Sequence, residues 1–161
     1  MVMLMQRRRS KFGVNMTEKG KQDRTYPDYY TNEPILFDSK LEKNYYVQVV
    51  IPGLEDGSIK KVERQVKYQL QPSFKKNGKS IRSIDYISDF TLTLADGSVL
   101  VVDTKGQATA DAKIKRKMMY YVHPELHFVW MAHTVATGWI EYDELEKIRK
   151  EKRKAKKNEN K

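Results

Sequence analysis

The sequence contains no cysteine, few glycines and prolines, and no long apolar run. Without cysteine the protein can form no disulfide, thiolate metal site or thiol nucleophile, which fits a reducing compartment. A transmembrane helix needs about 18 or more consecutive apolar residues, so we expect no membrane partner. In the opening MVMLMQRRR the basic residues follow the apolar ones, which is the reverse of a secretory signal.

The residues that are present suit one folded domain with a basic excess. The 161 residues include 39% apolar and 11% aromatic side chains, which excludes a fully disordered chain. The net charge of +10 predicts a polyanionic partner, most often nucleic acid. Residues 1–24 carry +5 of this charge and residues 141–161 carry +3. The body between them is nearly balanced because it holds 13 acidic residues, some of which are candidates for holding a cation.

Composition divides the chain into three stretches. Residues 1–34 are polar and aperiodic and predict a basic flexible arm. Residues 35–140 predict the domain that carries the chemistry, and residues 141–161 predict a basic C-terminal helix or tail. Within the domain, apolar residues recur every four positions over about 39–50, which predicts a helix that begins at Asp38-Ser39 and is broken by Pro52-Gly53.

The rest of the domain alternates between strand and helix patterns. We expect strands over about 62–70, 84–94, 98–104 and 127–131, and helices over about 111–121 and 140–157. Asn77-Gly78 marks a turn, and Asp96-Gly97 predicts a tight hairpin. The element order α-β-β-β-α-β-α predicts an α/β fold with a mixed central sheet flanked by helices.

Two carboxylates and a lysine are expected to converge at this hairpin. The turn at Asp96-Gly97 lies midway between Asp89 and Asp103, so antiparallel pairing brings these two residues roughly opposite each other. Asp103 and Lys105 project to the same side because side chains two apart in a strand share a face. Surface charges at strand ends are the other interpretation, and the pattern alone leaves both open.

The set suits metal-dependent hydrolysis of phosphodiester bonds. Carboxylate oxygens are ligands for Mg²⁺, which polarises the scissile phosphate and lowers the pKa of the attacking water. A nearby lysine helps to orient that water and to stabilise negative charge on the phosphate.

The same residues resemble a known family. Asp89 and the Asp103-x-Lys105 motif, preceded by a helix carrying Glu42, resemble the PD-(D/E)xK nuclease superfamily. YISDF at 86–90, VDTKG at 102–106 and HPEL at 123–126 resemble, more narrowly, Holliday-junction resolvases of the bacteriophage endonuclease I type. Small phage nuclease-like proteins of uncharacterised type are also similar. The resemblance covers about residues 35–131 and implies a restriction-endonuclease-like α-β-β-β-α-β core.

The resemblance implies a role for each matching residue. Asp89 and Asp103 correspond to the metal-binding acids, Lys105 to the catalytic lysine, and Glu42 to the first-helix acid that positions the metal or its water. Glu63 corresponds loosely to a further metal-binding acid, and a solvent-facing strand residue is its other interpretation. Two positions depart from the pattern. Ser88 stands where the superfamily has proline, and Asp103 stands where many relatives have glutamate.

The implied cofactor is Mg²⁺ or Mn²⁺, and the implied partner is DNA, a four-way junction cut by a homodimer in the cytoplasm of a bacterial host cell. Gln107, Lys113, Lys117 and Tyr121 follow the motif and are candidate nucleic-acid contacts, although a solvated helix face explains the last three equally well. Two other functions stay open: a duplex nickase or sequence-specific endonuclease with the same chemistry, and a non-catalytic nucleic-acid-binding module whose acids are structural.

Overall fold

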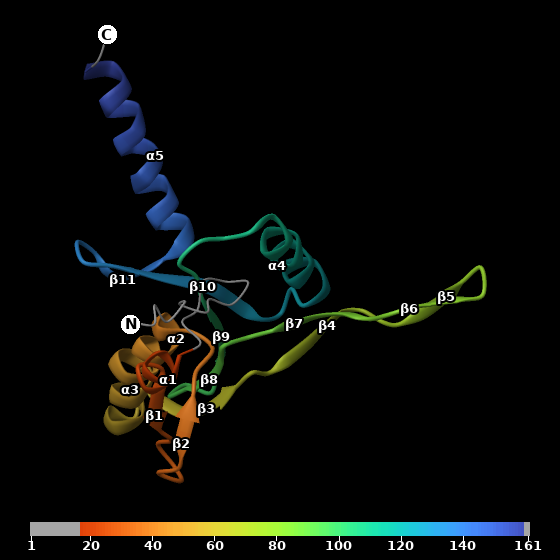
Figure 1. The fold of residues 1–161 in the computed structure, drawn as a ribbon, viewed down its shortest axis with the longest axis horizontal. Coiled ribbons are helices and arrows are strands. Elements are labelled where there is room, and N and C mark those ends of the chain that lie inside the picture. The colour runs from red at the N-terminus through yellow and green to blue at the C-terminus, as the bar shows by residue number, and fades with distance from the viewer. Residues whose placement is uncertain (1–16, 160–161) are drawn as a thin grey trace, which may run out of the picture. The chain divides into compact units, whose positions relative to one another are not determined.

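The computed structural model describes residues 17–159 and shows a mixed α/β protein (Figure 1). The chain divides into two compact units between Glu55 and Asp56. This boundary falls inside the stretch 35–140 that the sequence analysis treats as a single domain. No helix among residues 17–159 is long and apolar enough to cross a membrane.

The described part of the N-terminal unit begins with a short helix and a strand pair. It contains α1 (Glu18–Gln22), β1 (Thr25–Pro27) and β2 (Pro34–Leu36), and the two strands pair antiparallel. Of the basic arm expected over 1–34, residues 17–34 thus contain regular secondary structure, and residues 1–16 lie outside the described part. The buried Arg24 holds this segment in place, because its Nη1 donates to the carbonyl oxygens of Phe37 at 2.6 Å and Asp38 at 3.1 Å.

The following helix begins where the sequence predicts and ends later. The Ser39 hydroxyl accepts a 3.0 Å hydrogen bond from the Glu42 amide and caps α2 (Lys40–Tyr45). A π-helical turn, η1 (Tyr46–Val50), joins α2 to α3 (Ile51–Asp56). Pro52 thus lies inside a helix instead of ending it. Proline clashes with the carbonyl four residues earlier in a regular α-helix, and the wider π turn directly before it changes that geometry.

The C-terminal unit contains a five-stranded sheet in the order β11-β10-β9-β8-β3. β9 and β10 are parallel and the other pairs are antiparallel, so the predicted mixed sheet is confirmed. The five strands of the sheet are β3 (Ile59–Arg64), β8 (Phe90–Leu94), β9 (Val99–Thr104), β10 (His127–Thr134) and β11 (Gly138–Glu141). The helices of this unit are α4 (Ala110–Val122) and α5 (Tyr142–Glu159).

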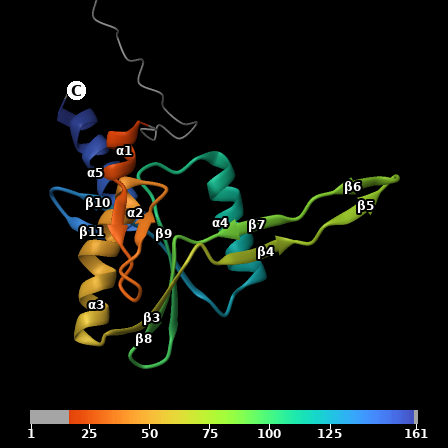
Figure 2. The same ribbon diagram turned by 60° about the horizontal axis from the view of Figure 1, so that its bottom comes forward.

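One core joins the sheet to both helices of this unit. Val101, Phe128 and Trp130 are buried on one face of β9 and β10, where they pack with Met119 of α4 and Leu145 of α5. Removal of this apolar surface from water is the main stabilising contribution. The chain leaves the end of β9 through residues 105–109 and enters α4 (Figure 2).

Each of the two long strands expected over 62–70 and 84–94 is broken in the middle. The outgoing side consists of β3, β4 (Lys67–Gln71) and β5 (Phe74–Lys76), and the returning side of β6 (Lys79–Ile81), β7 (Ile84–Ile87) and β8. Arg64 pairs with Phe90 and Lys67 with Ile87, so the register continues across the gap and Gln65 lies opposite Asp89. The break occurs because Gln65 adopts a φ of 53°, outside the extended region.

The part of this ribbon beyond the break, residues 67–87, is called the β-arm. It turns at Asn77-Gly78, as the sequence predicts, and both residues have positive φ. Figures 1 and 2 show the β-arm projecting from the sheet past α4. Its root is fixed to that helix, since the Lys115 ammonium donates to the Asp85 carbonyl at 2.8 Å and a His123 ring nitrogen lies 3.0 Å from the Gln69 carbonyl oxygen.

Candidate active site

The hairpin formed by β8 and β9 brings two aspartates together. Residues of the two strands pair from Thr93 with Val99 to Phe90 with Val102, and the next step of this register places Asp89 opposite Asp103. The turn is set by Asp96, whose Oδ1 accepts hydrogen bonds from the Ser98 amide at 2.8 Å and the Ser98 hydroxyl at 2.6 Å. The register expected from the turn position is confirmed.

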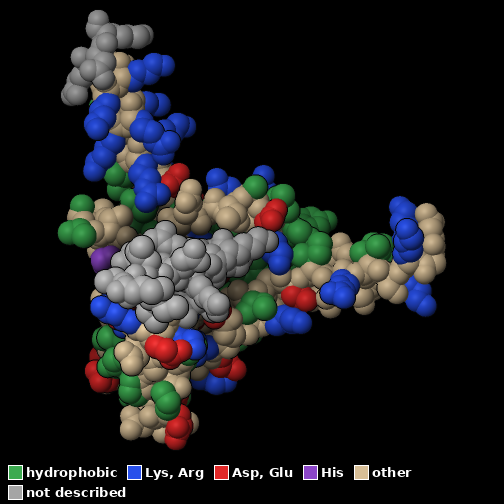
Figure 3. Space-filling view, in the orientation of Figure 1, with side chains coloured by type: hydrophobic (Ala, Val, Ile, Leu, Met, Phe, Trp, Pro, Cys, Tyr) green, Lys and Arg blue, Asp and Glu red, His purple; other side chains and the backbone are tan. Residues whose placement is uncertain are grey.

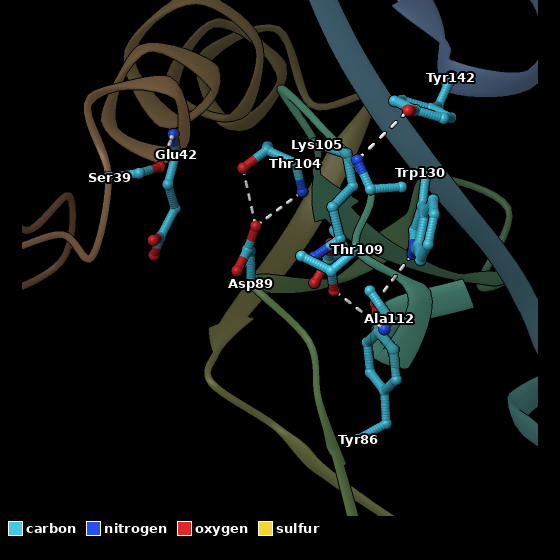
Figure 4. Close-up of polar contacts among 12 residues, drawn as sticks. Ser39, Glu42, Tyr86, Asp89, Thr104, Lys105, Thr109, Ala112, Trp130 and Tyr142 are labelled. Carbon is cyan, nitrogen blue, oxygen red and sulfur yellow. Dashed lines mark hydrogen bonds and ion pairs between the residues drawn. The ribbon is translucent and has the colours of Figure 1, made fainter. Parts of the chain in front are cut away.

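The Asp89 side chain is held by the residue that follows Asp103. Its Oδ2 accepts hydrogen bonds from the backbone amide of Thr104 at 2.7 Å and from the Thr104 hydroxyl at 2.8 Å (Figure 4). On the backbone, the Asp89 carbonyl accepts from the Gln65 amide at 3.3 Å. Asp89 therefore lies at the break in the ribbon, between β7 and β8, rather than within a continuous strand as expected.

The Asp103 carboxylate is buried and electrostatically strained. Only 3% of the residue is exposed, and its side chain forms an ion pair with the Lys105 ammonium. Burial raises the pKa of Asp103 to about 7, and the negative charge of Asp89 contributes to the rise, while Lys105 offsets part of it. The site therefore holds too little positive charge to balance two ionised carboxylates. An added cation would favour the ionised form of Asp103.

Two aromatic residues that the sequence analysis did not select support this pair. Trp130 lies beside Asp103 in the parallel β9–β10 ladder, and its Nε1 donates a 2.8 Å hydrogen bond to the Tyr86 hydroxyl. Burial and the neighbouring charge of Asp103 raise the pKa of Tyr86, so the phenol stays protonated. A hydrogen bond from Tyr86 in turn lowers the pKa of Asp103. In the sequence, the only signal for this role of Tyr86 was its position three residues before Asp89.

The Trp130 ring also orders the cations next to the carboxylates. The Lys105 ammonium lies 5.3 Å from the ring centroid, and the Arg116 guanidinium lies 4.5 Å from it. Arg116 is in turn held by Asp143, with two nitrogen–oxygen distances of 2.7 Å. Cation–π attraction and the ion pair with Asp103 together restrain the lysine head beside the carboxylate pair.

The structure does not group Glu63 with the two aspartates. Glu63 pairs with Thr91 in the β3–β8 ladder, its side chain is 50% exposed, and its carboxylate forms a 3.1 Å ion pair with Lys61. Within residues 17–159 there is no cluster of three or more histidines and acidic residues arranged to hold a metal ion. The C-terminal unit thus offers two carboxylates, from Asp89 and Asp103.

Glu42 belongs to the N-terminal unit and has a clear local role there. Its Oε2 accepts a 3.1 Å hydrogen bond from the Asp38 amide, and its own amide donates to the Ser39 hydroxyl. This reciprocal arrangement closely resembles a capping box, which stabilises the first turn of a helix. The residue is almost fully buried.

The four candidate nucleic-acid contacts lie on the loop after β9 and on α4. Gln107 is exposed on the loop, just before Thr109 caps α4. Lys113, Lys117 and Tyr121 are all exposed and follow one another at four-residue spacing, so they form one stripe along the helix. Tyr121 is 88% exposed, which is unusual for a large aromatic side chain.

A family model described as "Protein of unknown function (DUF1064)" matches residues 28–137. The chain belongs to this family. The DUF1064 segment contains Asp89, Asp103 and Lys105 and ends before α5 begins. No curated protein and no solved structure matches the chain.

Proposed function

We propose that this DUF1064 protein is a metal-dependent nuclease that hydrolyses phosphodiester bonds in DNA. The observation that best supports the proposal is the opposition of Asp89 and Asp103 across the β8–β9 hairpin, with Lys105 paired to Asp103. The resemblance of these three residues to the PD-(D/E)xK nuclease superfamily supports the same chemistry.

The donor set suits a hard divalent cation such as Mg²⁺ or Mn²⁺. Mg²⁺ in proteins often uses one or two carboxylates and keeps several waters, so Asp89 and Asp103 would be sufficient protein ligands. The raised pKa of Asp103 supports this assignment, because a bound cation would relieve the repulsion between the two carboxylates. When bound, the metal would polarise the phosphate and activate a water molecule.

The chain's own residues supply the remaining requirements. Thr104 keeps the Asp89 carboxylate oriented through two hydrogen bonds, and Lys105 holds a positive charge beside Asp103. In this proposal the lysine stabilises the negative charge that develops on the phosphate and orients the attacking water. Tyr86 and Trp130 are positioning residues that keep Asp103 and Lys105 in place.

For the substrate, we propose branched DNA, a four-way junction cut by a homodimer. The resemblance to junction resolvases supports this choice, and two copies would supply two sites for two opposed nicks. The exposed basic residues of α4 and α5 would add contacts to the phosphate backbone, which supplies most nucleic-acid affinity. Cutting of plain duplex by the same site is the alternative.

The test compares labelled junction, flap, duplex and single-stranded DNA with and without Mg²⁺. Wild type is expected to cleave the junction only with the metal, and Asp103→Asn is expected to bind the junction without cleaving it. Asp96→Asn is the matched control, because Asp96 is an exposed carboxylate of the same hairpin. Full cleavage by Asp103→Asn, or an equal loss in both variants, would contradict the assignment. If none of the four DNA substrates is cleaved in the presence of Mg²⁺, a non-catalytic nucleic-acid-binding module is favoured.

A further inference from the structure

The far end of the β-arm is an exposed, basic ribbon. Every residue of β5 and β6 is exposed, including Phe74 at 45% and Ile81 at 39%. Residues 72–83 contain four basic and no acidic side chains. Figure 3 shows Lys and Arg gathered at this end of the molecule as well as along α5. Exposed large apolar side chains within a basic segment are characteristic of a binding surface.

The strand register sorts these side chains onto two faces. Phe74 pairs with Ile81, and Lys76 pairs with Lys79. Because alternate residues of a strand share a face, these four side chains lie together on one side of the ribbon. Lys75 and Ser80 lie on the other side. The side formed by Phe74, Lys76, Lys79 and Ile81 is called the tip face.

The β-arm is built to present this surface at a fixed place. Its root is bound to α4 through the Lys115 and His123 contacts, and the Tyr68 and His123 rings lie 5.7 Å apart, edge to face. Asn77-Gly78 forms the tight turn that matches the twist of a two-stranded ribbon. An isolated pair of strands is marginally stable, so an anchored root is what allows the tip to protrude.

We propose that the tip face binds in a groove of a nucleic-acid duplex. A two-stranded ribbon fits the major groove of B-form DNA, lysines pair with the phosphates on either side, and apolar side chains contact base edges such as the thymine methyl group. Charge favours this partner over a second copy of the chain, because two identical basic tips repel each other. The inference rests on the proposed function only in taking nucleic acid as the ligand.

The test measures binding to a labelled duplex of about 24 base pairs, which is longer than two helical turns. EDTA is present throughout, so that cleavage plays no part. Lys76→Ala/Lys79→Ala is compared with Lys60→Ala/Lys61→Ala, which removes the same charge from exposed positions of β3, outside the β-arm and away from its turn. The tip variant is expected to bind about tenfold more weakly and to lower the slope of log affinity against log salt by about 2. The control variant is expected to keep the wild-type slope.

A second variant, Phe74→Ser/Ile81→Ser, is expected to weaken binding several-fold without changing the salt slope. A shortened chain in which Asn-Gly joins Ser73 directly to Arg82 is expected to combine both losses and guards against misfolding of the point variants. Equal affinity and slope for the tip and control variants would overturn the inference. The inference would also be overturned if Phe74→Ser/Ile81→Ser converted a dimer into a monomer but bound the duplex as tightly as wild type. If this binding pattern holds but no cleavage occurs with Mg²⁺, the proposed function fails and the tip inference stands.

Discussion

Trp130 donates a 2.8 Å hydrogen bond from its indole nitrogen to the hydroxyl of Tyr86, next to the buried carboxylate of Asp103. Both aromatic residues belong to the core that joins the sheet to α4 and α5. The packing of the core and the protonation of the candidate active site therefore depend on the same two side chains.

The Tyr86→Phe variant tests this dependence. Tyr86 lowers the pKa of Asp103, so its loss is expected to raise that pKa further in the metal-free protein. Loss of the acceptor also leaves the Trp130 N–H unpaired, which should lower the free energy of unfolding by about 1–3 kcal/mol. Carboxyl NMR titration in EDTA measures the first effect and denaturant unfolding the second. An unchanged Asp103 titration would contradict the role assigned to Tyr86.

Asp103 is expected to reduce the stability of the metal-free protein. Its folded pKa is raised to about 7, above the unfolded value, so the folded state binds more protons and loses stability as pH rises between the two values. Asp103→Asn should therefore increase the free energy of unfolding above pH 7 by about 1 kcal/mol or more.

Divalent metal should stabilise wild type but not the Asp103→Asn variant. Mn²⁺ is expected to raise the Tm of wild type, because a ligand that binds only the folded state stabilises it, and to leave the Tm of Asp103→Asn unchanged. Asp96→Asn again serves as the control and should respond as wild type does. Thermal unfolding in EDTA and in Mn²⁺ gives both results, and equal Mn²⁺ shifts in all three proteins would rule out Asp103 as a ligand.

Lys105→Ala should separate chemistry from binding. The lysine pairs with Asp103 and lies over Trp130, so its removal is expected to lower the cleavage rate about a hundredfold or more. Junction affinity should change by less than about tenfold, because one phosphate contact at most is lost. Single-turnover cleavage and equilibrium binding are the two measurements. A parallel loss of both would assign Lys105 to binding alone.

The Arg116–Asp143 pair should contribute an acid-sensitive part of stability. The hydrogen bonds from Arg116 hold the pKa of Asp143 below its usual value. The contribution is therefore present at neutral pH and is lost as pH falls through the folded pKa. Asp143→Asn should lower the free energy of unfolding by about 1 kcal/mol or less at pH 7, because the carboxylate is largely exposed. In urea unfolding this difference should vanish in strong acid, and a constant difference would contradict the pair's role.

The sequence predicted those features that local chemistry determines. Asp96-Gly97 and Asn77-Gly78 are strong turn signals, and each turn sets the register of the strands it joins. The opposition of Asp89 and Asp103 follows from the first turn alone. The start of α2 at Ser39 was likewise predictable because the cap residue is local.

Features that depend on distant partners were not predictable. Nothing about Gln65 signals positive φ, so the break in the ribbon was missed. Trp130 lies next to Asp103 because of the parallel register of β9 and β10, and no turn determines that register. Pro52 was expected to end a helix, and the π turn before it has no simple sequence signal. Residues 17–34 lack periodicity, and buried contacts such as those of Arg24 order them instead.

The β-arm also sets a distance. From Asp89, opposite Gln65, to Gly78 at the turn, the returning side of the ribbon covers 11 residue steps, at most roughly 36 Å at about 3.3 Å per residue, with one register shift between Gln69 and Gln71. One turn of B-form DNA has nearly the same length, about 34 Å. A duplex lying along the β-arm would thus meet the aspartate pair and the tip face on the same side of its helix. Cleavage would fall in helical phase with the tip contact, about ten base pairs away, and inserting cross-strand pairs into the ribbon would shift that interval.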